Sequence, residues 1–174
     1  MLHKPRDHTA ITATTPINGT ARHLKILLAY DLPTRASAFE DALNANPNFI
    51  VRTTSDAREI EPLFNKWHFD ILFLDMHMAH LPGSIVLAHF SRAIKAKELG
   101  VIAMCNVDDY AMFERALVLG ALDACAINIA PSEAVGRAHA AGKWLKKNSR
   151  LETLNNEDGE NIIPIPLMPF SMLG

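Results

Sequence analysis

Two aspartates follow apolar runs at positions where their carboxylates could do chemistry. Asp75 ends the stretch DILFLD at residues 70–75, and Asp31 directly follows LKILLAY at residues 24–30. A carboxylate can act as a nucleophile that accepts a transferred group, and carboxylate oxygens are preferred ligands of hard cations such as Mg²⁺. Asp75 is therefore a candidate acceptor. The alternative is a buried strand that merely ends in a polar residue.

Four histidines lie near Asp75 in the sequence: His68, His77, His80 and His89. Imidazole suits Zn²⁺, Cu²⁺ and Ni²⁺, but this spacing fits no structural zinc pattern, and the two cysteines form no C-x₂-C pair. A pH-sensitive loop is a second interpretation, because histidines titrate near neutrality. We favour the simpler interpretation that His77 and His80 are exposed loop residues beside the site.

The composition argues against several classes of protein. The chain has 174 residues and a formal net charge of −2, which disfavours a generic surface for nucleic acid or anionic membranes. No apolar run approaches the roughly 18–20 residues needed to span a bilayer, and residues 1–22 lack the apolar core of a secretion signal. We expect a cytoplasmic protein in which Cys105 and Cys125 are buried thiols rather than a disulfide.

Short apolar runs alternate with segments whose apolar residues recur at helical spacing. Strands are expected at residues 24–30, 48–54, 69–75, 101–105 and 122–127. Helices are expected at 33–46, 84–99, 108–120 and 131–152, with Gly100 ending the helix at 84–99. A further helix, which contains Ile60, Leu63 and Phe64, is expected to begin after a cap at Ser55 or Asp56. Five strands alternating with five helices predict an α/β domain whose parallel sheet is covered on both faces.

A parallel sheet of this kind places its site beyond the carboxyl ends of the strands. We therefore expect one edge of the sheet to gather Asp31, Asp75, Cys105, Asn106, Ile127 and Asn128.

The two ends of the chain differ from the alternating region. Residues 1–22 lack periodicity and predict a flexible tail, which leaves a domain at 23–152. Residues 153–174 are rich in proline and apolar side chains, and proline disfavours both helix and central strand. This end is either disordered or an extended segment that docks in a groove of its own domain or of a partner.

Residues 24–147 resemble the receiver domain of bacterial response regulators, which act in two-component and phosphorelay signalling. The stretch FDILFLDMHMAHLPG carries the resemblance through Asp70, Asp75, Met78 and Gly83. KILLAYDLPTR and GALDACAINIAPSEAV resemble the first strand and the fifth-strand region of that family. The resemblance implies the (βα)5 receiver fold, a flavodoxin-like, doubly wound, five-stranded parallel sheet.

The resemblance also implies a reaction, phosphoryl transfer from a phosphohistidine to Asp75 with a divalent cation. Asp31 matches the second member of the family's acidic pair. Mg²⁺, if bound, would be held weakly by Asp31, Asp75 and the backbone carbonyl of His77.

Several positions depart from the family pattern. Tyr30 replaces the first acid of the pair, Cys105 the hydroxyl residue after the fourth strand, and Ile127 the lysine. The remaining departures are Ala79 and Asn128 at proline positions and Ala124 at the aromatic switch position. Ile127 supplies no charge to a phosphoryl group, and a thiol is only a weak hydrogen-bond donor.

We therefore expect an atypical single-domain receiver, or pseudo-receiver, that signals through protein contacts. It would have no enzymatic activity beyond self-phosphorylation and dephosphorylation at Asp75. The alternative is a functional acceptor that relays a phosphoryl group through Asp75. A small-molecule enzyme on the same sheet is disfavoured, because no glycine-rich phosphate loop follows the first strand.

The expected partners are a histidine kinase, a phosphotransfer protein or a downstream effector. In this family the partner surface is commonly the face of the fourth helix, fifth strand and fifth helix, here residues 108–120, 122–127 and 132–147. The same face could support a homodimer. We expect no direct contact with nucleic acid or a membrane.

Overall fold

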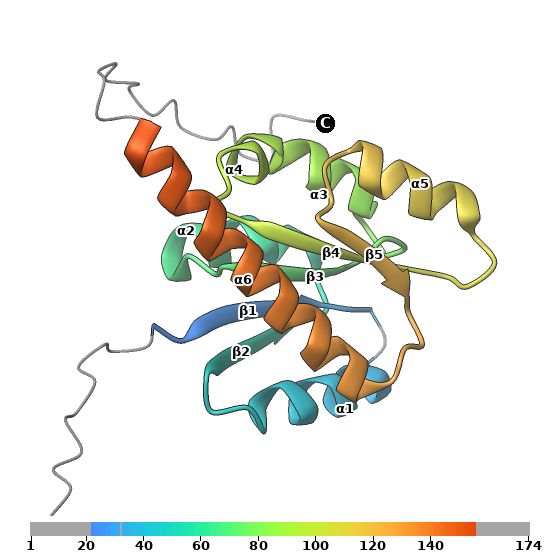
Figure 1. Ribbon diagram of the computed structural model, residues 1–174. Helices are drawn as coiled ribbons and strands as arrows, with labels where there is room; N and C mark the ends of the chain where they lie inside the picture. Colours follow the sequence, from blue (N-terminus) through green and yellow to red (C-terminus); the bar gives the residue numbers. More distant parts are fainter. Residues whose placement is uncertain (1–21, 32, 156–174) are drawn as a thin grey trace, which may run out of the picture.

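The structure is a computed structural model that describes residues 22–31 and 33–155, with side chains described for 22–31 and 38–148. Its centre is a five-stranded parallel sheet with the strand order β2-β1-β3-β4-β5 (Figure 1). The strands are β1 (Leu24–Ala29), β2 (Phe49–Thr54), β3 (Ile71–Asp75), β4 (Gly100–Cys105) and β5 (Asp123–Ala126). This order and the matching positions of the apolar runs confirm the predicted α/β fold.

Helices cover both faces of the sheet. They are α1 (Pro33–Asn44), η1 (Ala57–Glu59), α2 (Ile60–Trp67), α3 (Gly83–His89), α4 (Ser91–Lys95), α5 (Tyr110–Val118) and α6 (Pro131–Asn155). The core forms two clusters, because successive side chains of a strand point to opposite faces. Ile26 and Leu28 pack with α1 and α6, whereas Leu27 and Ala29 pack with α2 to α5.

The central strands are the fully apolar runs of the sequence. Every residue of β3 and of β4 is buried, as expected for strands covered on both faces. Asp70 stands just before β3, and its backbone N–H donates to the carbonyl oxygen of Lys25 at 2.7 Å. The Asp70 carboxylate also accepts the Lys25 N–H at 2.8 Å. Asp70 therefore connects the start of β3 to β1 through two hydrogen bonds with the backbone of Lys25.

The single helix predicted at 84–99 is wrong, because two helices occupy this region. Phe90 separates α3 from α4, with φ −85° and ψ 6°, and its ring is fully buried against Phe64. This bend keeps the Phe90 ring in the core while the chain turns back toward the sheet. Gly100 does not end the helix but begins β4, and Lys97, at φ 58°, makes the left-handed turn instead. The described part of the chain thus has six α-helices rather than five.

The second helix accommodates its proline. The Asp56 side chain accepts the Arg58 N–H at 2.9 Å and caps η1, which leads directly into α2. Pro62 lies in the first turn of α2, where a missing N–H leaves no hydrogen bond unmade. Asp56 therefore caps the turn that leads into α2, whereas Glu59, the N-cap of α2 itself, makes no side-chain capping hydrogen bond.

The ends of the chain are only partly described. Helix α6 continues to Asn155, past the predicted end at residue 152, and the predicted tails otherwise lie outside the described residues. Within residues 22–31 and 33–155, no helix is both long and apolar enough to cross a membrane. Cys105 and Cys125 are both buried free thiols.

Candidate functional site

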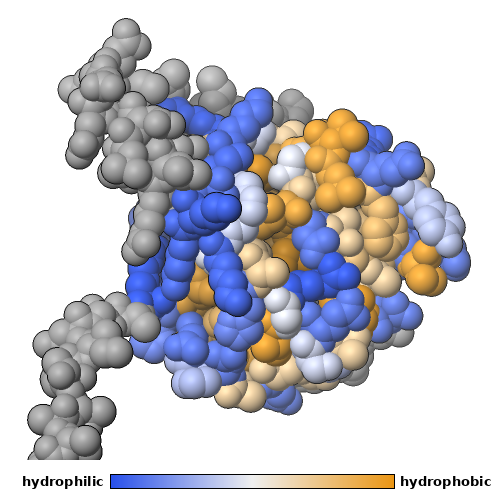
Figure 2. All heavy atoms as spheres, in the orientation of Figure 1, coloured by the Kyte–Doolittle hydropathy of each residue, from blue (hydrophilic) through white to orange (hydrophobic). Residues whose placement is uncertain are grey.

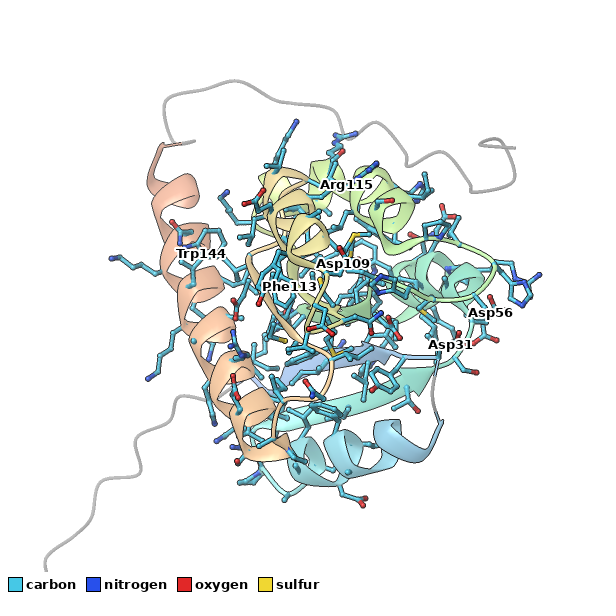
Figure 3. The ribbon with its side chains drawn as sticks, turned by 90° about the vertical axis from the view of Figure 1, so that its right-hand side faces the viewer. Asp31, Asp56, Asp109, Phe113, Arg115 and Trp144 are labelled. Carbon is cyan, nitrogen blue, oxygen red and sulfur yellow. The ribbon has the colours of Figure 1, made fainter. Side chains whose placement is uncertain are left out.

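Asp75 and Asp31 lie at the carboxyl edge of the sheet, which faces the viewer in Figure 3. Asp75 is the last residue of β3 and is 3% exposed, and its Oδ1 accepts the His77 N–H at 2.8 Å. Asp31 follows β1, and its Oδ2 accepts the Ala79 N–H at 3.2 Å. The two carboxylates therefore hold the loop after β3 by its backbone.

Burial raises the pKa of the Asp75 carboxyl above its ordinary value of 3.8. Hydrogen bonds from the backbone N–H groups of His77 and Asp31 oppose this rise, while the negative charge of Asp31 adds to it. A nucleophilic carboxylate must be ionised, so desolvation works against the use of Asp75 as an acceptor.

This pKa shift predicts a pH-dependent gain in stability from Asp75→Asn. Because the pKa of Asp75 is raised in the folded state, its ionisation at neutral pH lowers the free energy of unfolding. The variant should be more stable than wild type at neutral pH. The difference should vanish as the pH falls below 3.8, the unfolded-state value, where Asp75 is protonated in both states.

Urea denaturation across this pH range measures the effect. Asp108→Asn, at an exposed carboxylate after β4, controls for the loss of one negative charge. A difference between wild type and Asp75→Asn that does not change with pH contradicts the prediction.

Tyr30, where the resemblance expects an acid, turns into the core. It is 1% exposed, and its ring centroid lies 6.1 Å from that of Phe39. Its hydroxyl donates to the backbone carbonyl oxygen of Ile127 at 3.4 Å, a long hydrogen bond. Tyr30 therefore adds no charge to the edge and links the end of β1 to the chain just after β5.

Cys105 ends β4 and is fully buried. Burial, together with the negative charges of Asp109 and Asp75, raises the pKa of its thiol to about 11. The group is thus a neutral thiol at physiological pH, with only weak hydrogen-bonding capacity toward an anion. Its backbone carbonyl accepts the Ile127 N–H at 2.7 Å, which fixes Ile127 beside the end of β4.

His77 and Asp109 form a pair that the sequence did not single out. The His77 Nε2 lies 3.2 Å from Asp109 Oδ2, and Asp109 also caps α5 by accepting the Met112 N–H at 3.1 Å. Asp109 is labelled near the middle of the edge in Figure 3, while Asp31 and Asp56 lie together toward one side. In the sequence, the acids Asp108 and Asp109 indicated only the start of a helix, and nothing indicated a contact with His77.

A cavity of about 570 Å³ opens between the loops after β4 and β5. It is lined by Asn106, Val107, Asp108, Asp109, Ile127 and Asn128. This lining holds two carboxylates and no cationic side chain, so its charge disfavours a phosphoryl anion.

The structure does not bring the four histidines together. His77 and His80 lie in the loop after β3, where His80 has a φ of 69°. His68 ends α2 at the other edge of the sheet, and His89 is buried with Nε2 3.3 Å from Glu61 Oε1. Among the described residues, no three His, Cys, Asp or Glu side chains form a group that could hold a metal ion.

Asp31, Asp75 and the His77 carbonyl form the donor set expected for Mg²⁺. All three donors are oxygens, which is the chemistry that Mg²⁺ prefers, and Asp31 lies close enough to Asp75 to affect its ionisation. Two carboxylates and one carbonyl supply only some of the ligands of an octahedrally coordinated cation, and water would supply the others. The residues fit a weak Mg²⁺ site.

Comparison with known proteins agrees with this architecture. Residues 26–137 match the response regulator receiver domain family. The receiver domain of the Francisella response regulator 1452 is similar in structure, with a TM-score of 0.62, 20% identity, and coverage of 72% of this chain and 99% of that one. No curated protein sequence matches the chain.

Two further solved structures are similar. The chemotaxis response regulator CheY4 of Vibrio cholerae has a TM-score of 0.61 and 16% identity, covering 68% of this chain and 98% of that one. A DNA-binding response regulator of the LuxR family from Staphylococcus aureus has a TM-score of 0.61 and 18% identity, with the same coverage. At these identities the structures show a shared fold.

Proposed function

Because this chain belongs to the response regulator receiver domain family of two-component signalling, we propose that it is an atypical receiver that acts through protein contacts. Its phosphorylation site is degenerate, with Asp75 and Asp31 kept and the acid, hydroxyl and lysine positions changed to Tyr30, Cys105 and Ile127. It needs no enzymatic activity beyond self-phosphorylation and dephosphorylation at Asp75.

The hydrogen bond from Tyr30 to the Ile127 carbonyl carries this proposal. This bond joins two of the three changed positions. Tyr30 contributes the hydroxyl of a buried ring, and Ile127 contributes only its backbone carbonyl. A lysine at position 127 would attract the negative charge of a phosphoryl group, and a low effective dielectric would strengthen that attraction. Here that position holds an apolar side chain packed against the core under α1 and α6.

A second function, relay of a phosphoryl group through Asp75, is favoured by the placement of that side chain. Asp75 ends β3 beside Asp31, with a backbone N–H on its Oδ1. Mg²⁺ held by Asp31, Asp75 and the His77 carbonyl would neutralise charge on the transferring group. The donor in this case would be a histidine kinase or a phosphotransfer protein.

The partner surface that we propose is the face of α5, β5 and α6. Exposed apolar side chains gather on and beside α5, with Tyr110 75% and Val118 86% exposed. Apolar side chains that stay in solvent are common at protein-binding surfaces. A kinase, a phosphotransfer protein, an effector or a second copy could bind here, in the cytoplasm and without direct contact to nucleic acid or membrane.

Partner binding should therefore depend on α5 and not on Asp75. A tagged Asp75→Asn chain, expressed at the native level, should retain the same proteins as wild type in the same amounts. Val118→Asp should weaken that retention by roughly tenfold, as for loss of an interface anchor. Quantitative mass spectrometry of the retained proteins measures both effects. Loss of partners in a folded Asp75→Asn chain overturns the proposal.

A further inference from the structure

A second cavity, of about 540 Å³, lies at the amino ends of the strands, at the edge opposite Asp75. Its apolar lining comes from three layers of the fold. Leu24 begins β1, Phe64 lies in α2, Phe69 precedes β3 and Leu145 lies in α6. In Figure 1, α2, α4 and the second half of α6 surround the side of the sheet where β1 begins. None of these residues takes part in the site around Asp75.

The rim of this cavity carries more positive than negative charge. Arg22, Lys97 and Lys146 contribute three cations, against the carboxylates of Asp70 and Glu98. Arg22 is bound to Asp70 at 2.8 Å, and the Lys97 ammonium lies 5.0 Å from the ring centroid of Trp144. Figure 2 shows hydrophilic side chains along α6 beside this region. An apolar floor with a basic rim suits an apolar segment that is preceded by acids.

We propose that residues 162–172 of this chain dock in the cavity, with the acids at 157, 158 and 160 facing its basic rim. Seven of these eleven positions carry apolar side chains: Ile162, Ile163, Ile165, Leu167, Met168, Phe170 and Met172. Three prolines alternate with them and restrict the backbone to extended conformations, which lowers the entropy lost on binding. Extended proline-rich segments bind apolar grooves in this manner.

The connecting chain is long enough to reach. Helix α6 passes the cavity at Lys146 and ends at Asn155, which corresponds to about 14 Å of helix at 1.5 Å per residue. The six residues 156–161 can span about 20 Å when extended. They include Asp158-Gly159, a pair that favours a turn. Residue 162 can therefore return along α6 to the cavity.

A spin label on the full-length chain tests this proposal. Ser171→Cys provides the attachment point. Cys105 and Cys125 react slowly, because both are buried and burial raises the pKa of their thiols to about 11 and about 12. Paramagnetic broadening of backbone amide signals should concentrate at Leu24, Phe69 and Leu145. The same chain with a reduced, diamagnetic label provides the reference.

One single variant and one matched pair of variants sharpen the test. Leu167→Asp should abolish the localised broadening without affecting the domain. Lys146→Glu should weaken it, whereas Lys143→Glu, an equal change at an exposed residue of α6 that does not line the cavity, should not. Equal effects of the two lysine variants contradict the role of the rim.

Three outcomes would overturn the proposal. The first is broadening at Val107 and Val118 instead, which would place the segment on α5. The second is no localised broadening anywhere. The third is broadening of an isotope-labelled chain by a separate spin-labelled chain, which would mean that a second copy's segment fills the cavity.

Discussion

Tyr30→Asp, which places an acid where the resemblance expects one, is expected to lower the free energy of unfolding by about 3–5 kcal/mol. That is the usual cost of deleting a buried aromatic ring. The ring is 1% exposed and packs against Phe39, so its removal leaves a cavity under α1. The new carboxylate would also stand next to Asp31 and near Asp75, where repulsion adds to the loss. Urea denaturation at neutral pH measures the change.

The other tyrosine of the chain is a matched control. Tyr110 is 75% exposed at the start of α5, so Tyr110→Asp should change stability by less than about 0.5 kcal/mol. Tyr30→Phe isolates the hydroxyl, and loss of its long hydrogen bond to Ile127 should cost about 0.5–1 kcal/mol. Equal stability of Tyr30→Asp and Tyr110→Asp would show that position 30 still tolerates the acid.

Gly83→Ala is expected to destabilise the fold by about 1–3 kcal/mol, in the range of overpacked cores. A Cβ at this position would lie 2.7 Å from the Cα and from the Sδ of Met76, and 3.3 Å from the Asp75 carbonyl oxygen. The backbone of Met76 cannot yield easily, because its N–H is bonded to Met104 and its carbonyl to Gly83. The start of α3 must therefore move away from the end of β3.

Gly136→Ala is the control for this second prediction. Apart from the adjacent backbone of its own helix, nothing lies within 4 Å of a Cβ at Gly136, an exposed residue in the second turn of α6. Replacing a helical glycine by alanine should raise stability by roughly 0.5–1 kcal/mol. Thermal and urea denaturation of both variants should give effects of opposite sign. A stabilising effect of Gly83→Ala would mean that α3 and β3 are not in close contact.

The fold was predictable because its strands are apolar runs with clear limits. The runs ending at Asp75 and Cys105 became β3 and β4 nearly as expected, and parallel pairing then placed their ends at one edge. The break at Phe90 was not predictable, since the periodicity of 84–99 continues through it. Only the packing of the Phe90 ring in the core requires the bend.

The candidate site was predictable in its positions but not in its contacts. The resemblance places Tyr30 and Ile127 where the family has charged residues, but the sequence does not show that the tyrosine ring turns inward and reaches the Ile127 carbonyl. The pairing of His77 with Asp109 joins two loops that are separated by β4. Such contacts depend on tertiary packing, which local periodicity does not encode.

The most direct test of the central claim is an intact-mass measurement after incubation with acetyl phosphate and Mg²⁺, repeated with a phosphohistidine donor protein. A typical receiver treated in parallel shows that the donors are active. Because the Asp75 carboxyl is buried with a raised pKa and Ile127 stands where our proposal expects the lysine, the wild-type chain is expected to gain no phosphoryl group. A gain of one phosphoryl group that Asp75→Asn abolishes would contradict the account and establish Asp75 as a working acceptor.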